Sequence, residues 1–422
     1  MKMASINKRC QPLAFTGIAA ALMEKGQTIH SKFRLKIPSD ESCVSKVDAA
    51  SEEAELLRNN DVFIIDECSQ VDKFMLRAID RCLRDLTGLN VQFGGKCIIL
   101  AGDYRQCLPV VKKPSNHKPE TIILKADRRM WQSFERHSLV ENVRADLNAT
   151  AFKLWCLRVG NGEERRLRNT SLIKLPNQVI CENDLIDSVF GEGRITQESL
   201  VTSNRAILCP TNQDSLEINE LILDRLEGDL TEQYFSMDSI YESDDGITYP
   251  LEYAHRETPN GYPPHELKLK VGAIVMLIKN WNIPLGLCNG TRMRVVQCGN
   301  HFIKCAILSG PRKDQEFTFS RVKFFPSEQD SHRIERFQFP FRLAFAMTIN
   351  KSQGQTFDKI GILLRTPVFS HGQLYVAVSR VRNYESLCIM VENNPVGDRM
   401  QGVIAGEEGV YTQNIVNPTV LL

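Results

Sequence analysis

Short apolar runs constrain the fold of this chain more than any other feature. Six such runs recur with helical patterns between them, and residues typical of turns bound each one. They span 61–66, 96–103, 205–210, 342–348, 359–364 and 386–391. Runs of this length are typical of buried strands, and buried strands that alternate with helices are typical of parallel sheets. The sequence therefore predicts an α/β fold.

The domain organisation follows from length and from a change of pattern. A chain of 422 residues favours two or three domains, because about 150 residues per domain is usual. We expect two parallel-sheet domains, over 1–148 and 149–422. Residues 266–325 alternate short β segments with hairpin-like turns, which predicts a small barrel inserted in the second domain. We expect loops in the polar stretches 39–60 and 227–263.

Composition excludes several classes of protein. The formal charge is +1, from 52 Lys and Arg against 51 Asp and Glu, so any site for a polyanion must be a local groove. The 13 cysteines form no C-x-x-C pair and mostly lie in apolar runs. We interpret them as reduced core residues of an intracellular protein, not as disulfides or a zinc site. The sequence has no signal-peptide core and no apolar run long enough to span a membrane.

Two adjacent carboxylates, Asp66 and Glu67, follow the apolar run "FII". Open α/β sheets bind ligands outside the carboxyl ends of their strands. In enzymes that hydrolyse nucleoside triphosphates, one acid there holds Mg²⁺ through water and the next polarises the attacking water. We predict these roles for Asp66 and Glu67. The alternative is a solvated strand end without function.

Three further segments place polar residues behind apolar runs. Gln106 follows the run at 96–103 and could sense the γ-phosphate of a nucleotide. The segment 343–357 gathers hydroxyls, amides and one lysine, which suits a sugar–phosphate backbone, although a polar helix cap would look the same. In 371–383 the apolar residues predict a helical face that leaves Arg380 free to reach outward. An arginine so placed can neutralise charge on a phosphoryl group in transfer.

The order of these motifs and the residues within them resemble those of one protein family. The chain is similar to the superfamily 1B DNA helicases of the PIF (petite integration frequency) type, and especially to the helicase part of Helitron-like transposable elements. The matching blocks are "TGIAAALMEKGQTIHSKFRLKIP", "IIDECSQVDKFMLRAIDRCLRDL", "FGGKCIILAGDYRQCLPVV", "LVENVRA", "AILCPTNQDSLEINELIL", "LKVGAIVMLIKNWNIPLGLCNGTR", "AFAMTINKSQGQTF" and "YVAVSRVRN". They run from residue 16 to near 383.

The resemblance implies a fold and an activity. It implies two RecD-like motor domains with a small SH3-like β-barrel insert, ATP as substrate, Mg²⁺ as cofactor and 5′-to-3′ movement on single-stranded DNA. The resemblance also implies forked or structured duplex DNA as a second partner. It implies a role in repair, recombination, telomere maintenance or transposition. A nuclear location follows from the family, whereas the oligomeric state stays open.

The resemblance also implies roles for individual residues. Asp66 and Glu67 match the Mg²⁺-binding and water-activating acids, and Gln106 matches the γ-phosphate sensor. Arg144 and Arg380 match two arginine fingers. The residues that match the DNA track are Thr16, Gly17, His30, Ser31, Phe33, Thr348, Lys351, Ser352 and Gln353. For Phe33 core packing is the alternative, and for His30 an ordinary hydrogen-bonded histidine.

One motif of the family has no counterpart. A glycine-rich phosphate loop, G-x-x-x-x-G-K-[ST], should precede Thr16, and "FGGKC" (93–97) fails because no Ser or Thr follows its lysine and it enters a strand. We expect an N-terminally truncated helicase sequence, inactive in this form, because the other motifs match in detail. A degenerate protein that binds single-stranded nucleic acid without catalysis is the alternative. A small-molecule kinase fits less well, since it does not need "TINKSQGQT" or "YVAVSR".

Overall fold

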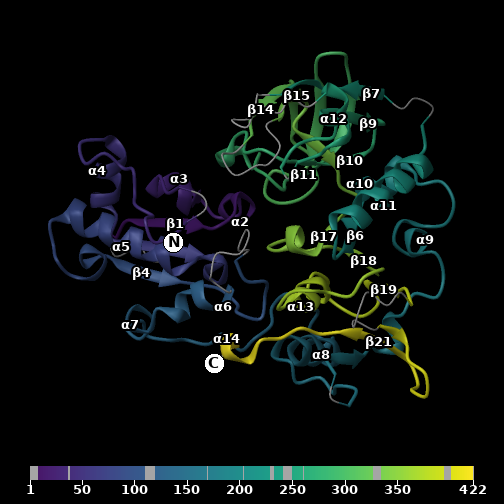
Figure 1. Ribbon diagram of the computed structural model, residues 1–422, viewed down its shortest axis with the longest axis horizontal. Helices are drawn as coiled ribbons and strands as arrows, with labels where there is room; N and C mark the ends of the chain where they lie inside the picture. Colours follow the sequence, from purple (N-terminus) through teal and green to yellow (C-terminus); the bar gives the residue numbers. More distant parts are fainter. Residues whose placement is uncertain are drawn as a thin grey trace. The chain divides into compact units, whose positions relative to one another are not determined.

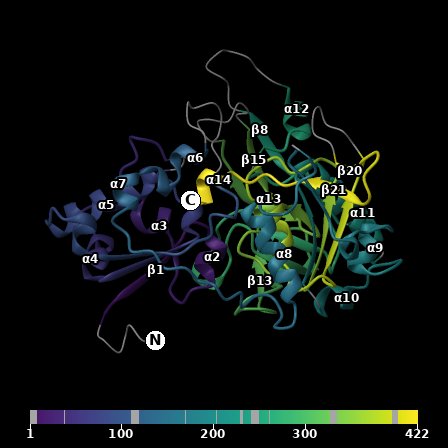
Figure 2. The same cartoon turned by 90° about the horizontal axis from the view of Figure 1, so that it is seen from below.

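A computed structural model gives the fold of the chain. It describes residues 8–36, 39–109, 119–168, 170–202, 204–228, 232–240, 250–259, 261–326, 334–393 and 401–421. The chain divides into two compact units (Figures 1 and 2). Unit 1 comprises Met1–Leu175, Pro367–Asn383 and Asn393–Leu422, and unit 2 comprises Pro176–Thr366 and Tyr384–Glu392. The expected boundary between motor domains at 148/149 stays a prediction.

A parallel four-stranded sheet organises the first part of unit 1. Its strand order is β2-β1-β3-β4, with all neighbours parallel. The strands are β1 (Cys10–Ala14), β2 (Gln27–Thr28), β3 (Val62–Asp66) and β4 (Cys97–Leu100). Phe63 and Ile65 of β3 are fully buried, because β3 lies between two other strands and its side chains pack into the core. The predicted strand at 61–66 and the parallel sheet are confirmed.

The last strand of this sheet differs from the sequence prediction. We expected a buried strand over 96–103, but in β4 Cys97 is exposed and Ile99 is 40% exposed. The reason is position: among the described residues, only β3 pairs with β4, so β4 is an edge strand. Its outer backbone groups are open for pairing with a further strand.

Helices complete unit 1. Helix α5 has Asp72 as its N-cap and ends at Gly88, whose left-handed φ of 68° suits glycine. Helices α8 and α13 lie against each other (Figures 1 and 2), near the small antiparallel sheet β20-β21-β5. The other bounds are α2 (Gly17–Ala21), α3 (Ile29–Phe33), α4 (Glu52–Asn59), α5 (Lys73–Thr87), α6 (Pro119–Ile122), α7 (Arg128–Trp131), α8 (Thr150–Asn161), α13 (Gln373–Val378), α14 (Pro418–Leu421), β5 (Leu172–Lys174), β20 (Gly402–Val403) and β21 (Val410–Gln413).

Unit 2 contains a second parallel sheet, of order β17-β6-β18-β19. Its strands are β17 (Ala346–Thr348), β6 (Arg205–Cys209), β18 (Lys359–Leu364) and β19 (Leu387–Val391), and its helices are α9 (Leu185–Phe190), α10 (Gln197–Thr202) and α11 (Asn212–Arg225). The predicted strands at 205–210, 359–364 and 386–391 are confirmed. The run 342–348 is not one strand, because its first part, β16 (Phe341–Leu343), pairs antiparallel with β10 (Ile274–Leu277).

Antiparallel strands form the rest of unit 2. One sheet has the order β13-β12-β11-β10-β16, and two smaller sheets are β14-β15-β8 and β7-β9. The bounds are β7 (Glu232–Phe235), β8 (Met237–Ile240), α12 (Leu251–Arg256), β9 (Glu266–Leu269), β11 (Arg292–Cys298), β12 (Ile303–Ile307), β13 (Glu316–Phe319), β14 (Val322–Phe324) and β15 (Ile334–Gln338). The predicted β segments within 266–325 are therefore present.

Two expectations of loops or poorly ordered insertions are wrong in part. The stretch 39–60 contains helix α4, whose N-cap Ser51 accepts a hydrogen bond from the Ala54 amide. The stretch 227–263 contains β7, β8 and α12, and residues 241–249 within it lie outside the described ranges. The prediction from polar composition failed in both places, because short amphipathic helices and strands at a surface contain few apolar residues.

Two further observations concern the cysteines and the helices. Most of the thirteen cysteines are buried, so the prediction that they are core residues is confirmed for the majority. Across the described ranges, no helix combines the length and the apolar character needed to cross a membrane.

Candidate active site

The candidate site of unit 1 begins where β3 ends. Asp66 is the last residue of β3, and Glu67 adopts a left-handed conformation with φ 53° and ψ 43° that turns the chain sharply. The Cys68 amide then donates to the Ala101 carbonyl at 2.8 Å, beyond the end of β4. This bond holds the two carboxylates at the carboxyl edge of the sheet, where ligands of such folds bind.

Gly102 makes this close approach possible. A Cβ atom on Gly102 would lie 2.8 Å from the Cys68 Sγ atom and 2.9 Å from the Cys68 backbone nitrogen. Contacts this short are not tolerated, so a side chain here would push the two strand ends apart. The glycine of "AGD" is therefore explained by packing between the strand ends.

Glu67 is an unusual carboxylate. Burial, and then the negative charge of Asp66, raise its pKa, whereas the positive charges of Arg380 and Arg144 act to lower it. Its buried Oε2 atom has no hydrogen-bond partner among the described residues. A half-buried carboxylate with a raised pKa and a buried, unpaired oxygen is suited to accept a proton or to hold water on a metal ion.

Asp66 and Glu67 together fit a magnesium ion. Both offer hard oxygen ligands, and Mg²⁺ usually binds through one or two carboxylates while keeping much of its water shell. The unpaired Oε2 of Glu67 is an acceptor that such water would satisfy. Asp66 Oδ1 accepts from the Glu67 amide at 2.9 Å, which fixes the orientation of the first carboxylate.

The loop after β4 is held by a network around Asp103. Asp103 Oδ1 accepts from the Arg105 Nε atom at 2.7 Å, and Oδ2 accepts from the Tyr375 hydroxyl at 2.8 Å. The Gln106 amide donates to the Asp103 carbonyl at 3.1 Å. The predicted sensor Gln106 is thus tied through Asp103 to α13. Tyr375 was not singled out from the sequence, although this residue lies in the block "YVAVSRVRN".

His371 ties the same loop to the C-terminal segment. Its Nε2 atom donates to the Tyr104 carbonyl at 2.8 Å, and its Nδ1 atom accepts from the Asn417 amide at 2.9 Å. These two bonds require a neutral ring with the proton on Nε2, and burial lowers the pKa of His371 in agreement. No spacing in the sequence could have revealed this role, because the partners lie far apart in the chain.

The two predicted finger arginines lie near each other. Arg144 is exposed and donates through Nη1 to the Ser379 carbonyl at 3.2 Å, and Arg380 Nη2 donates to the Ser379 hydroxyl at 2.9 Å. Burial, and then Arg144, lower the pKa of Arg380 to about 10, so it is charged at neutral pH. Both charges act on Glu67.

The expectation that Arg380 reaches outward is wrong. Its side chain is only 1% exposed, and its Nε atom donates to the Val376 carbonyl at 2.8 Å. The helical-face argument failed because α13 ends at Val378, two residues before the arginine. Arg380 therefore follows the turn after the helix, on the buried side.

The N-terminal residues matched to the DNA track lie in α2 and α3. Thr16 caps α2 by accepting from the Ala19 amide at 3.3 Å, and Gly17 is buried in the first turn. Ser31 is exposed, and the half-buried His30 lies edge-on to Phe15 with ring centroids 5.3 Å apart.

Phe33 does not lie at the surface. It is fully buried in the core, and its ring centroid lies 5.8 Å from that of Phe63. The ring is therefore not presented to a base in this structure, and of the two interpretations offered by the sequence, core packing is the one observed. A base-stacking role for Phe33 is corrected accordingly.

The remaining track residues belong to unit 2, at the end of β17. Thr348 is the last residue of that strand, Lys351 is exposed, and Gln353 is half-buried. Ser352 is fully buried and its hydroxyl donates to the Ile349 carbonyl at 2.7 Å, so it holds the turn instead of facing solvent. Although Lys351 reaches solvent, partial loss of water around its amine, and then the charge of Arg342, lower its pKa to about 8.

A substitution at Glu67 tests the electrostatic description without any ligand. Because the pKa of Glu67 is raised in the folded chain, its ionised form opposes folding at high pH and its neutral form does not. Glu67→Gln should therefore raise the free energy of unfolding at about pH 8, and the gain should shrink as the pH falls through the pKa of the carboxyl group. Urea denaturation at both pH values measures this.

The matched control for that experiment is Glu55→Gln, on the exposed face of α4. It should change stability little at either pH. Equal behaviour of the two variants would contradict the raised pKa assigned to Glu67.

Comparisons with known proteins identify the family that this chain resembles. A family model described as PIF1-like helicase matches residues 2–170, and a model of the 2B domain of the DNA helicase Pif1 matches residues 252–298. The ATP-dependent DNA helicase PIF1 of Danio rerio is 31% identical over 332 residues, which are 78% of this chain and 46% of that protein. The chain thus spans about half the length of this curated relative.

Solved structures of Pif1 helicases have a fold similar to that of this chain. The Pif1 helicase from Bacteroides in complex with ADP-AlF3 and single-stranded DNA has a TM-score of 0.62 and 25% identity, covering 96% of this chain and 89% of that one. The Pif1 helicase from Candida albicans has a TM-score of 0.64 and 22% identity, covering 93% and 86%. Family models, a curated relative and solved structures therefore agree that this chain belongs to the PIF1-like helicase family.

Proposed function

We propose that this chain forms the core of an ATP-dependent DNA helicase that moves 5′ to 3′ along single-stranded DNA and opens forked or structured duplexes. The observation that carries the proposal is the surroundings of Glu67. A buried carboxylate with an unpaired oxygen lies beside Asp66, under the influence of two arginines. This arrangement matches the needs of phosphoryl transfer to water.

In the proposed reaction each group has a separate task. Asp66 would hold Mg²⁺, which would neutralise charge at the phosphates. Glu67 accepts the proton of the attacking water through its unpaired Oε2 atom. Arg144 and Arg380 offset the charge that develops on the transferred group. The charges of these arginines also favour the ionised form of Glu67, which is the form that can accept a proton.

We further propose that Asp103 couples the nucleotide to the rest of unit 1. Gln106 would sense the γ-phosphate, and its loop is bonded through Asp103 to Tyr375 of α13. Since α13 leads directly to Arg380, movement of the loop after hydrolysis would also move an arginine of the site. This is a physical route by which loss of phosphate changes the conformation of the unit.

For the DNA track we propose two kinds of contribution. Exposed or half-exposed groups, such as Ser31, Thr348, Lys351 and Gln353, would contact the sugar–phosphate backbone. The remaining residues, Thr16, Gly17, Phe33 and Ser352, would hold the α2, α3 and β17 segments in shape, and His30 would do so while partly exposed. Contacts to the backbone would explain binding that tolerates any sequence.

A phosphate loop is needed to complete the nucleotide site. The loop supplies an amide cradle, a lysine for the phosphates and a hydroxyl for Mg²⁺, and the sequence contains no such motif. We therefore expect the 422 residues by themselves to hydrolyse ATP weakly. We infer that the open edge of β4 receives the strand that carries such a loop, because its partly exposed apolar residues resemble those of an interior strand.

The missing motif also favours a second candidate function, a non-catalytic module that binds single-stranded nucleic acid. In either case we propose a nuclear location and a role in repair, recombination, telomere maintenance or transposition, as the family suggests. Turnover of ATP by a completed chain separates the two candidates.

The decisive experiment adds a family-type strand and phosphate loop upstream of residue 1. We expect phosphate release stimulated by single-stranded DNA in the extended chain, and none above background for its Glu67→Gln variant, which should still bind nucleotide. Arg144→Ala and Arg380→Ala should each lower turnover by about 10³–10⁵-fold with smaller effects on nucleotide binding.

A matched control is Arg312→Ala in unit 2, whose side chain donates to the Gln315 side chain and to the Pro284 carbonyl. It should leave turnover unchanged. Full turnover by the extended Glu67→Gln chain would remove Glu67 from the chemistry, and strong hydrolysis by the native 422 residues would remove the need for a phosphate loop.

Lys351 provides a test of the DNA track in unit 2. Since its pKa is lowered to about 8, its charge is present below that pH and is lost above it. Binding of single-stranded DNA should therefore weaken between about pH 7 and about pH 9, and Lys351→Arg should remove that weakening. Lys351→Ala should reduce the slope of log affinity against log salt by about 0.7.

The exposed Lys313 of the same unit is the control, and Lys313→Ala should leave both the slope and the pH profile unchanged. Fluorescence anisotropy with a labelled oligonucleotide measures both quantities. If Lys351→Ala binds with the salt slope of the parent chain, Lys351 does not contact a phosphate.

A further inference from the structure

A buried arginine lies beside the segment of unit 2 that carries the proposed DNA track. Arg292 belongs to β11 of the antiparallel sheet, and its side chain is only 4% exposed. Burial lowers the pKa of its guanidinium to about 9, and no carboxylate of the described residues offsets this effect. A buried charge without a counter-charge lowers stability unless hydrogen bonds satisfy it. The hydrogen-bond partners of Arg292 therefore indicate its role.

These partners are two backbone carbonyls and one side-chain amide. The Nε and Nη2 atoms donate to the Ala344 carbonyl at 3.1 and 2.9 Å, and Nη2 also donates to the Arg205 carbonyl at 2.7 Å. The Nη1 atom donates to the Asn204 Oδ1 atom at 2.6 Å. The planar fork of arginine suits such a set, because its donors are fixed relative to one another. One side chain of the antiparallel sheet thus holds the start of β6 and the residue after β16.

Asn204 extends this contact to a second part of the chain. Its Nδ2 atom donates to the Thr356 carbonyl at 3.0 Å. Its own backbone is fixed by Asp358, whose Oδ2 atom accepts from the Asn204 amide at 2.8 Å and whose amide donates to the Asn204 carbonyl at 2.9 Å. The Cζ atom of Arg292 also lies 5.3 Å from the centroid of the Phe357 ring. Arg292 therefore reaches this second part through Asn204 and through the ring.

The two contact points enclose the residues matched to the DNA track in unit 2. The track segment, defined as residues 345–356, contains Thr348, Lys351, Ser352 and Gln353. It starts directly after Ala344 and ends at Thr356, so both of its ends are bonded, directly or through Asn204, to one guanidinium. Holding both ends of a loop restricts the conformations that the residues between them can adopt.

We propose that Arg292 is a positioning residue for the DNA track: by holding both ends of the track segment, it sets where Lys351 and Gln353 lie. The inference rests on the proposed function of these two residues in binding single-stranded DNA. Arg292 itself makes no contact with DNA in this arrangement, because it is buried. The antiparallel sheet thereby fixes part of a DNA-binding surface that belongs to the parallel sheet.

The sequence did not single out Arg292, although this residue ends the matched block "LKVGAIVMLIKNWNIPLGLCNGTR". An arginine in a strand is more often exposed than buried. Its partners lie 52 to 88 positions away in the chain, so local spacing could not reveal them.

The salt dependence of DNA binding tests the proposal. In the parent chain, Lys351→Ala should lower the slope of log affinity against log salt by about 0.7. Arg292→Lys keeps a positive charge but loses the fork, so the track segment should shift and Lys351 should lose its phosphate. Arg292→Lys should therefore lower the slope by a similar amount, and adding Lys351→Ala should lower it little further. A purely structural role for Arg292 predicts no such coupling.

Hydrogen exchange follows the track segment without DNA. The amides of Gln353 and Gln355 donate to carbonyls within the segment. In Arg292→Lys they should exchange at least about tenfold faster, while the amides of β14 and β15 keep their rates.

Asn204→Ala is a second variant, which keeps the proposal testable if Arg292→Lys does not fold. It removes the bond to Thr356, whereas the start of the segment stays held by Asn219, whose side chain exchanges two hydrogen bonds with the Ala346 backbone at 2.8 and 2.9 Å. Exchange at Gln355 should rise in this variant too.

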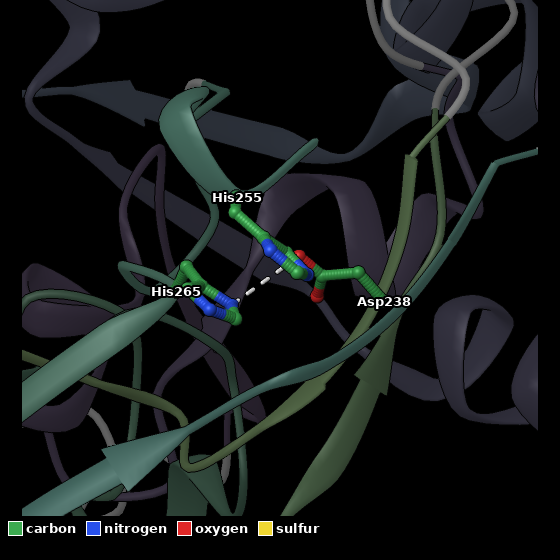
Figure 3. Close-up of side chains that lie close together, drawn as sticks. All are labelled: Asp238, His255 and His265. Atoms are coloured by element: carbon green, nitrogen blue, oxygen red, sulfur yellow. Dashed lines mark ion pairs between the residues drawn. The ribbon is translucent and has the colours of Figure 1, made fainter. Parts of the chain in front are cut away.

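The matched control is Arg336→Lys. Arg336 is also a buried arginine of unit 2, but it donates to both oxygens of Asp238, at 3.0 and 2.8 Å. Figure 3 shows Asp238 beside His255 and His265, which lie outside the track segment. The same chemical change at Arg336 should leave the salt slope unchanged, and Lys351→Ala should still lower that slope by about 0.7.

Equal salt slopes for the parent chain and a folded Arg292→Lys chain, or full additivity of Arg292→Lys with Lys351→Ala, would overturn the proposal. Unchanged exchange in Arg292→Lys and in Asn204→Ala would overturn it as well, whatever the DNA result. If the parent chain binds no single-stranded DNA, the proposed DNA track itself is wrong, and the exchange rates alone decide whether Arg292 holds the segment.

Discussion

The hydrogen bond from the Cys68 amide to the Ala101 carbonyl is the contact on which the candidate site depends. It joins the chain beyond β3 to the chain beyond β4, and it forms only because Gly102 leaves room for Cys68. The two carboxylates and the Asp103 loop therefore leave the sheet side by side. The candidate site uses residues from the ends of both β3 and β4, so the close approach of these two ends sets its geometry.

Charge balance sets the acidity of the half-buried Glu67. Burial and the neighbouring carboxylate of Asp66 disfavour its ionised form, and nearby positive charges can compensate for part of this effect. The charges of Arg380 and Arg144 supply that compensation, and Arg380 is itself held by the Val376 carbonyl and the Ser379 hydroxyl. The same groups that would assist phosphoryl transfer thus set the acidity of the base. The stability of the fold and the proposed proton transfer therefore both depend on the charge state of Glu67.

Much of this organisation could be predicted from the sequence. Apolar runs located β3, β6, β18 and β19, because a buried strand needs apolar residues on both faces. The adjacent acids indicated the candidate site, because they stand directly behind such a run. Composition could not show that β4 lies at an edge, since edge and interior strands here have the same apolar residues.

Other features depend on contacts between distant segments. The burial of Arg380 follows from the end of α13 at Val378, and helix ends are set by tertiary packing as much as by local residues. Tyr375 and His371 acquire partners far away in the chain. Phe33 and Ser352 belong to matched motifs, yet both are buried, which a motif alone cannot reveal.

The most direct measurement of the central claim is the pKa of Glu67 itself. Carbon NMR of the chain labelled at the glutamate carboxyl carbon, with the signal assigned by Glu67→Gln, follows its titration. The account predicts a pKa above that of an ordinary glutamate, and a further rise in Arg380→Gln, because Arg380 stabilises the ionised form. An ordinary pKa for Glu67, or one that Arg380→Gln leaves unchanged, would contradict the account.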